Sequence, residues 1–251
     1  MLNPPISRMG GKSRLRKEII KRIPEHICYV EIFFGAGWVY FGKDPSSVEV
    51  INDIDSELMN LFKMIKFHSE EVNRVMQYEI SSREAFYRYK EYNIKDLTEI
   101  QRAIRTIYVI TQSFASRGRD YGYGTTKTPS QRIFTTDNLQ ELRERLSNTY
   151  IENLSFEKII DKYDREHTFF FCDPPYFETD GYGNKFELEE HIKLNNMLKN
   201  IKGKFLLTIN DHKTIREMYK EFKIEEVQVL YSVSRASEGR KKFNELIITN
   251  Y

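Results

Sequence analysis

The 251-residue chain has few cysteines, almost no excess of charge and no long apolar run. Cys28 and Cys172 lie far apart without the spacing of metal ligands, so we expect neither a disulfide framework nor a metal site. Such sparse cysteine is typical of a reduced, cytoplasmic protein. No stretch has the length of a membrane span or the form of a signal region, which argues against a membrane protein. The net charge of +2 means that any surface for nucleic acid must be local.

The most informative stretch that is present reads Thr-Phe-Phe-Phe-Cys-Asp-Pro-Pro-Tyr, at residues 168–176. Its β-branched and aromatic start predicts a buried strand over residues 168–172. The two prolines that follow cannot donate to a sheet, so the strand must end there. Asp173 and Tyr176 are therefore expected at the carboxyl end of a strand, where open α/β sheets bind their ligands.

These residues suit one kind of ligand. The Asp173 carboxylate and the Pro174 carbonyl are two acceptors beside the flat ring of Tyr176, which fits the exocyclic amino group of a base. The alternative is a plain turn that ends a strand and happens to carry an acid. A cytosine-C5 enzyme would need a nucleophilic cysteine after a proline, and here Pro175 follows Pro174. Cys172 is therefore predicted to be a core residue.

Two further segments predict a nucleoside cofactor. Phe34-Gly35-Ala36-Gly37 follows an expected strand at 29–33 and leads into an expected short helix; glycines there let the backbone approach a ligand closely. Asp53 ends a second expected strand at 48–52, where an acid can hold both hydroxyls of a ribose. A competing role for Asp53 is the N-cap of a helix over 56–67, and the two roles can coexist.

The N-terminal segment Gly10-Gly11-Lys12-Ser13 invites comparison with a phosphate-binding P-loop. That pattern needs another glycine where this chain has Ile6, and a strand before it, and both are missing. We expect instead a flexible loop before a helix over residues 15–23. Such a loop can close over an anionic ligand.

The middle of the chain differs from the rest. Helical periodicity at 71–78, 83–92 and 97–113 predicts a helical insertion from about residue 70 to residue 148, with a last helix at 135–147. Within it, a loop interleaves arginine, glycine and tyrosine, side chains that can bind phosphates or stack on bases. A solvated glycine-rich loop is the alternative. The candidate DNA-binding residues are Arg117, Arg119, Tyr121, Tyr123, Lys127 and Arg132.

The remaining chain predicts an α/β pattern. We expect a strand at 150–153, helices at 188–200 and 212–222, a strand at 204–209, and a closing antiparallel pair at 225–231 and 245–250. Phe156 stands at a strand-to-helix junction, where it can lie against a flat ligand or belong to the core. The polar loop 177–186 suggests a lid, and the basic connection 232–242 could meet a phosphate backbone.

With the Gly-Lys loop, Phe-x-Gly-x-Gly, Asn-Asp and Asp-Pro-Pro-Tyr in this order, the chain resembles DNA adenine N6-methyltransferases, most closely the α-order, Dam-like group. The likeness covers nearly the whole chain. It implies a Rossmann-like α/β methyltransferase sheet, mostly parallel with a C-terminal antiparallel hairpin, plus a helical target-recognition lobe. Residues 1–64 and 149–251 would form the catalytic domain and residues 65–148 the inserted recognition domain.

The resemblance also implies the cofactor S-adenosylmethionine, a flipped adenine and double-stranded DNA as partner, with no obligatory protein partner. Asp173, Pro174 and Tyr176 match the catalytic motif. Arg8 stands where relatives usually have an aromatic residue, and Phe34 fills a variable slot of the glycine motif. The cofactor-contacting positions of the family fall on Arg8, Lys12, Phe34, Gly35, Gly37, Asp53, Phe156 and Asp173.

Several other functions stay open at this point. Cytosine N4 methylation presents the same amino group and acceptors, although the leading aspartate and the motif order favour adenine. A methyltransferase for RNA or for protein glutamine is a weaker alternative, because the insertion and its loop suit duplex DNA. The chain could also be a DNA-binding module with a degenerate cofactor site. Such a module would give no heat of S-adenosylmethionine binding in calorimetry.

Overall fold

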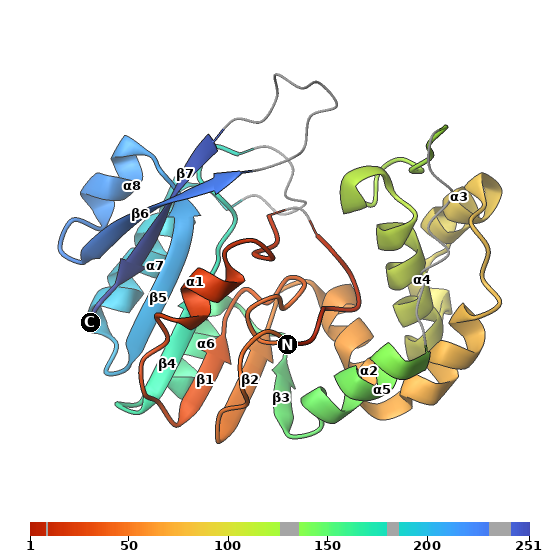
Figure 1. The fold of residues 1–251 in the computed structure, drawn as a ribbon, viewed down its shortest axis with the longest axis horizontal. Coiled ribbons are helices and arrows are strands. Elements are labelled where there is room, and N and C mark those ends of the chain that lie inside the picture. Colours follow the sequence, from red (N-terminus) through yellow and green to blue (C-terminus); the bar gives the residue numbers. More distant parts are fainter. Residues whose placement is uncertain (9, 126–135, 180–185, 231–241) are drawn as a thin grey trace. The chain divides into compact units, whose positions relative to one another are not determined.

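The computed structural model describes residues 1–8, 10–125, 136–179, 186–230 and 242–251 (Figure 1). These residues divide into two compact units. The helical unit comprises Met1–Ser13, Gly35–Asp44 and Asp55–Asn153, and the sheet unit comprises Arg14–Phe34, Pro45–Ile54 and Leu154–Tyr251. Each unit is described by itself.

Six described strands belong to the sheet unit, in the order β2-β1-β4-β5-β7-β6. Neighbours among β2, β1, β4 and β5 are parallel, and β7 is antiparallel to both β5 and β6. The predicted mostly parallel sheet with an antiparallel C-terminal pair is therefore confirmed. The bounds are β1 (Cys28–Glu31), β2 (Val48–Asn52), β4 (Thr168–Cys172), β5 (Lys204–Asn210), β6 (Lys223–Leu230) and β7 (Lys242–Thr249).

One face of this sheet is covered by three helices, α6 (Phe156–Tyr163), α7 (Leu188–Asn200) and α8 (Lys213–Met218) (Figure 1). Alternate strand residues and the apolar sides of these helices form one buried cluster, as expected for strands that lie inside an α/β fold. The cluster includes Val30, Phe170, Leu207, Leu246, Ile159, Leu194 and Ile215. A short helix, α1 (Arg16–Ile20), precedes β1 and buries Ile19 completely.

The helical unit is built from α2 (Ser56–Met76), α3 (Arg83–Glu91), α4 (Glu99–Thr111) and α5 (Thr136–Leu146), and β3 (Thr149–Glu152) also belongs to it. α2 packs against α4 and α5, and α3 packs against α4. α4 begins at a capping box in which Thr98 and Gln101 satisfy each other's backbone amides. Its apolar side then buries Ala103, Ile107 and Tyr108 completely.

The two helices expected over 56–67 and 71–78 are present as two helical segments of α2, which meet at a kink where the backbone of His68 is not helical (φ −137°, ψ 34°). Two sequence predictions need correction here. The short helix expected after Gly37 is instead a series of turns, in which the N–H groups of Phe41 and Gly42 donate to the carbonyls of Gly37 and Val39. The helix expected over 212–222 is shorter, since α8 ends at Met218. None of the described helices is long and apolar enough to cross a membrane.

Candidate active site at the carboxyl ends of the strands

Asp173 follows β4 directly and is half-buried. Its carboxylate is oriented by β5. Cys172 at the end of β4 pairs with Leu207 of β5, so the residues that follow them, Asp173 and Thr208, are also adjacent. Thr208 Oγ1 donates a hydrogen bond to Asp173 Oδ1 over 2.8 Å, and Thr208 is fully buried. The acid expected at the carboxyl end of this strand is thus held in a set orientation.

The rest of the Asp-Pro-Pro-Tyr loop is tied to the antiparallel part of the sheet. The hydroxyl of Tyr176 donates to Glu245 Oε2 over 2.5 Å. The backbone N–H of Phe177 donates to Asn210 Oδ1, and Asn210 Nδ2 donates back to the Phe177 carbonyl, each over 3.0 Å. Pro174 is buried, whereas Tyr176 keeps part of its surface accessible. Two strand residues therefore fix the loop beyond Asp173.

Cys172, immediately before this loop, is completely buried inside the sheet. Burial, together with the charge of Asp173, raises the pKa of its thiol, so the thiolate form is disfavoured. The prediction that Cys172 is a core residue is confirmed.

Asp53 lies at the same edge of the sheet, directly after β2, and is half-buried. It does not cap the following helix. That role belongs to Asp55, whose Oδ1 accepts from the backbone N–H groups of Glu57 and Leu58 at 3.1 and 3.2 Å. The competing interpretation of Asp53 as the N-cap is therefore wrong.

Asn52, one residue earlier, joins three segments of this edge. It is 1% exposed, and its Nδ2 donates to the carbonyls of Ile32 and Leu154 at 2.9 and 3.0 Å. Its Oδ1 accepts from the Leu154 N–H at 2.8 Å, and its carbonyl accepts from the Phe34 N–H at 2.8 Å. Asn52 thereby positions the chain on both sides of Asp53, a role that its sequence context did not indicate.

The aromatic residues near this edge are mostly buried. Phe34 is 2% exposed, and Phe156, the first residue of α6, is 8% exposed. Phe156 packs against Phe33 and Phe186 with ring centroids 6.1 and 5.7 Å apart. Phe33 is only half-buried, so it offers more accessible ring surface than either predicted residue.

Gly35 and Gly37 adopt backbone conformations that other residues rarely take, with φ +52° and +78°. A Cβ atom built on Gly35 would meet nothing within 4 Å. The backbone at Gly35 is thus open on the side where a side chain would otherwise stand, which leaves room for a ligand.

The N-terminal segment is a close-packed turn. Lys12 is 3% exposed, and its Nζ donates to the Gly10 carbonyl over 3.0 Å. Gly11 is required, because a Cβ there would lie 2.8 Å from Trp38 Nε1. Arg8 forms an ion pair with Asp55, with 2.9 Å between Nη2 and Oδ2, so the guanidinium predicted to contact a cofactor is engaged by the cap of α2.

The arginine- and tyrosine-rich loop that follows α4 is a folded hairpin. Its N–H groups at Phe114 and Gly122 donate to the Asp120 and Gln112 carbonyls over 2.8 and 2.7 Å. Ala115 and Ser116 have positive φ values of 53° and 55°, an unfavourable conformation for residues with a side chain. Such strain is often found at functional sites.

This loop displays the predicted DNA-binding residues. Arg117 and Arg119 are exposed, and Tyr123 is 68% exposed. Arg83, at the start of α3, places its guanidinium 5.1 Å from the ring of Tyr121 and 5.0 Å from that of Tyr123. Sequence reasoning did not identify Arg83, since its position in a helix carries no signal for this contact. The predicted residues Lys127 and Arg132 lie outside the described residues.

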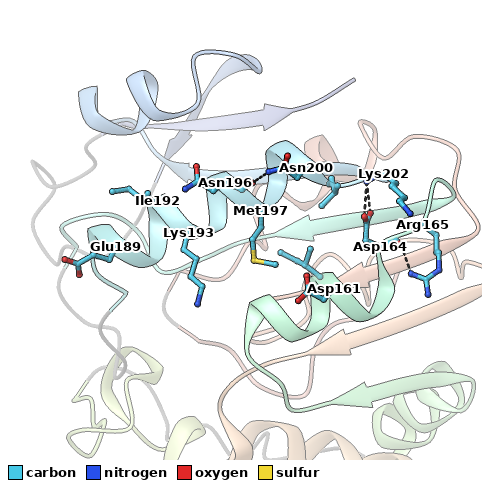
Figure 2. A pocket seen from close by; sticks show the side chains of 12 residues that line it. Asp161, Asp164, Arg165, Glu189, Ile192, Lys193, Asn196, Met197, Asn200 and Lys202 are labelled. Carbon is cyan, nitrogen blue, oxygen red and sulfur yellow. Dashed lines mark hydrogen bonds between the residues drawn. The ribbon is translucent and has the colours of Figure 1, made fainter.

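A pocket of about 630 Å³ opens between α6 and α7 (Figure 2). Asp161, Lys193 and Met197 line it, and it contains none of the residues that the sequence singled out. We assign it no part in the reaction. Among the described residues, no cluster of three or more His, Cys, Asp or Glu side chains could hold a metal ion.

The sheet unit therefore carries an oriented aspartate before two prolines and a tyrosine at the carboxyl end of a parallel strand, an arrangement that suits the binding of an amino group. The chain belongs to the family of D12 class N6 adenine-specific DNA methyltransferases, whose sequence model matches residues 9–233. It is thus an enzyme of adenine methylation in DNA.

The similar proteins found by sequence comparison are also DNA methyltransferases. The chain is 28% identical over 276 residues to the type II methyltransferase M1.LlaDCHI of Lactococcus lactis subsp. cremoris, covering 100% of this chain and 96% of that protein. It is 27% identical over 256 residues to the DNA adenine methylase of Escherichia coli K12, covering 95% and 91%. A solved structure of precorrin 8W decarboxylase from Methanobacterium thermoautotrophicum shows 10% identity and a TM-score of 0.43, covering 100% and 96%, too weak a likeness to carry an argument.

Proposed function

We propose that this enzyme transfers a methyl group from S-adenosylmethionine to N6 of an adenine that has left duplex DNA, with Asp173, Pro174 and Tyr176 at the reacting base. The observation that carries the proposal is the hydrogen bond from Thr208 to Asp173, which orients an acid at the carboxyl end of β4. A strand-ending turn without a function would not need a buried donor for this carboxylate.

Asp173 and the Pro174 carbonyl supply the two acceptors that an adenine amino group requires. When they hold its two hydrogens, the lone pair of the nitrogen is freed from the ring and becomes nucleophilic. Bound S-adenosylmethionine would supply an electrophilic methyl group on its sulfonium, which would become a neutral thioether, and the methylated nitrogen would release one of its two hydrogens as a proton. Acceptors that are oriented before the base arrives lower the barrier, because no reorganisation is needed during the reaction.

Tyr176 stacks on the base in this proposal. Removing a base from the helix costs a few kcal/mol, and stacking on an aromatic ring offsets part of this cost. The half-buried ring of Tyr176 has surface for such a contact, while its hydroxyl is held by Glu245.

The residues of the chain fit a nucleoside cofactor. Asp53 would accept from the ribose hydroxyls, since it lies directly after β2 at the carboxyl edge of the sheet and is half-buried. The open side of Gly35 and the positive φ of Gly37 suit a close backbone approach. Phe34 and Phe156 would contact the adenine of the cofactor with the little surface that they expose.

Lys12 and Arg8 complete the proposed cofactor set. Lys12 would contribute its charge to an anionic group of the ligand from its place in the N-terminal turn. Arg8 would have to exchange its ion pair with Asp55 for the cofactor, so its role has the least support from the geometry.

The helical insertion, residues 65–148, would recognise the DNA, and residues 1–64 and 149–251 would carry the reaction. The exposed Arg117 and Arg119 support this assignment, because guanidinium groups bind phosphates and guanine edges. Arg83 would hold Tyr121 and Tyr123 in place for contact with bases. Lys127 and Arg132 remain part of the proposed surface. DNA as substrate and the sparse cysteine both suit a cytoplasmic protein.

The test is mass spectrometry of nucleosides from unmethylated DNA after incubation with the protein and S-adenosylmethionine. We expect N6-methyladenine. N4-methylcytosine would keep the chemistry of Asp173 but change the base. Neither product, with the cofactor bound in calorimetry, would contradict DNA as the substrate, and absence of cofactor binding would leave a DNA-binding module.

A further inference from the structure

We propose that Glu245 is a positioning residue for methyl transfer, which acts by fixing the ring of Tyr176. This inference rests on the proposed role of Tyr176 as the residue that stacks on the target base. Glu245 is on β7, opposite Asn210 of β5, and is 1% exposed. Its Oε2 accepts the hydroxyl hydrogen of Tyr176.

A carboxylate is an unusual choice for this position. The next three residues of β7, Leu246, Ile247 and Ile248, are at most 1% exposed and contribute apolar side chains to the sheet. Burying a carboxylate costs free energy unless it is hydrogen-bonded, so an apolar residue at Glu245 would serve the sheet at least as well. One group that this carboxylate satisfies is the Tyr176 hydroxyl, which is part of the loop that carries Asp173.

The geometry restricts Tyr176 from two sides. Glu245 holds the hydroxyl end of the side chain, and Asn210, on the neighbouring strand, holds the backbone of Phe177 through two hydrogen bonds. A hydrogen bond to a charged acceptor is stronger than one between neutral groups. The ring is therefore confined at its far end as well as at its backbone, and its orientation is set before a base arrives.

Glu245 and Asn210 thus position the part of the loop beyond Asp173, and Thr208 positions Asp173 itself. Thr208 orients the acceptor for the amino group, and Glu245 orients the surface on which the base lies. A base that stacks on a freely rotating ring would sample poor angles to the methyl donor. Since a small misplacement can cost about 100-fold in rate, loss of the Glu245 contact should act on the rate of methyl transfer.

A purely structural role for Glu245 predicts a different result, and a double-mutant cycle separates the two. The variants are Glu245→Gln, which keeps the shape of the side chain but replaces the charged acceptor with a weaker neutral one, Tyr176→Phe, which removes only the hydroxyl, and their combination. Glu49→Gln is the matched control, because Glu49 is a 4% exposed glutamate on β2 that accepts a backbone N–H from Ser46.

The measurements are the single-turnover methylation rate at saturating DNA and S-adenosylmethionine, the dissociation constant of the cofactor, and the melting temperature. We expect each single variant to lose roughly 10- to 100-fold in rate, and the double variant to lose no more than the worse single one. Cofactor affinity should stay within about twofold, since the contact orients the base. Glu49→Gln should react at the wild-type rate.

A wild-type rate for Glu245→Gln would overturn the proposal, and so would losses that multiply in the double variant. If Glu245→Gln fails to fold, Tyr176→Phe is the deciding variant. A wild-type methylation rate in folded Tyr176→Phe would show that the hydrogen bond to Glu245 is not needed, and would overturn the proposal. A wild-type protein that forms no N6-methyladenine would overturn the proposed function and this inference together. A loss confined to the Glu245 and Tyr176 variants supports both.

Discussion

Thr208 and Asp173 are joined by a hydrogen bond of 2.8 Å between Oγ1 and Oδ1, and they are neighbours only because β4 and β5 run parallel in this register. Thr208 is fully buried on a strand, so water does not compete for its hydroxyl, and the hydrogen bond orients the Asp173 carboxylate.

Replacing Thr208 with valine removes this hydroxyl and keeps the shape of the side chain. We expect the single-turnover methylation rate to fall roughly tenfold, because a hydrogen bond to a charged group is lost. The affinity for S-adenosylmethionine should change little. Thr249→Val is the control, since Thr249 also lies on a strand, β7, and its hydroxyl donates to the Tyr251 carbonyl. An unchanged rate for Thr208→Val would show that Asp173 is oriented by other contacts.

Asp173→Ala removes the proposed acceptor for the amino group. We expect methylation to fall by at least about 100-fold, because preorganised electrostatic contacts of this kind contribute that much to catalysis. The fold and the affinity for DNA should be retained. Asp161→Ala, an exposed aspartate on α6, is the control. Radiolabel transfer to DNA measures the rate, and substantial turnover by Asp173→Ala would refute the role of this carboxylate.

Asp53 and Asp55 lie two residues apart and should respond differently to alanine. Asp53→Ala should weaken S-adenosylmethionine binding by roughly 10- to 100-fold, because the hydrogen bonds from the ribose hydroxyls to a charged carboxylate would be lost. Asp55→Ala should lower the free energy of unfolding by about 1 kcal/mol, since it removes the N-cap of α2. For both variants, calorimetry measures the affinity for S-adenosylmethionine and denaturant unfolding measures the free energy of unfolding. Cofactor affinity that survives in Asp53→Ala would exclude it from the ribose site.

Replacing Arg117 and Arg119 together with alanine should weaken DNA binding. Each phosphate contact that is lost should reduce the slope of log affinity against log salt by about one. Cofactor affinity should hold. Arg165→Ala, an exposed arginine of the sheet unit, is the control. A salt dependence and site preference equal to those of the wild type would remove this loop from the DNA-binding surface.

His191 predicts a pH dependence of stability. The ring is fully buried on α7 beside Phe177 and Phe186, and burial lowers its pKa from 6.5 to about 4. Between these two values the unfolded chain binds more protons than the folded protein, so the free energy of unfolding falls as the pH falls. The full effect is roughly 3 kcal/mol, reached below the folded pKa.

Denaturant unfolding of His191→Leu measures this contribution. The variant should lose less stability than the wild type between pH 6.5 and about 4. His68→Leu, at an exposed position of α2, should keep the wild-type slope. Equal slopes for the wild type and His191→Leu would mean that this imidazole does not remain neutral in the folded protein.

The strands and the position of the Asp-Pro-Pro-Tyr loop could be predicted because their signals are local. The run over β4 is β-branched or aromatic and ends at two prolines, so the end of the strand and the place of Asp173 follow from short-range chemistry. The cap of α2 could not be assigned so easily, since Asp53 and Asp55 both precede the helix. Only the backbone conformation decided that Asp55 accepts from the first turn.

Thr208, Asn210 and Glu245 were not predicted as parts of the site, and Asn52 was noted only as part of the Asn-Asp pair, with no role of its own. Each is a polar residue in or at the end of a strand, and such residues are common in exposed positions. Their importance arises from partners 20 to 102 residues away along the chain. No local pattern records such a pairing.

The sequence by itself determined the family, the motif order and which residues we propose to contact the base, because these depend on residue type and spacing along the chain. Only the tertiary structure decided how those residues are held. The parallel register of β4 and β5 places Thr208 beside Asp173, and the antiparallel pairing of β5 and β7 places Glu245 within reach of Tyr176. Orientation depends on contacts across strands, which sequence spacing does not encode.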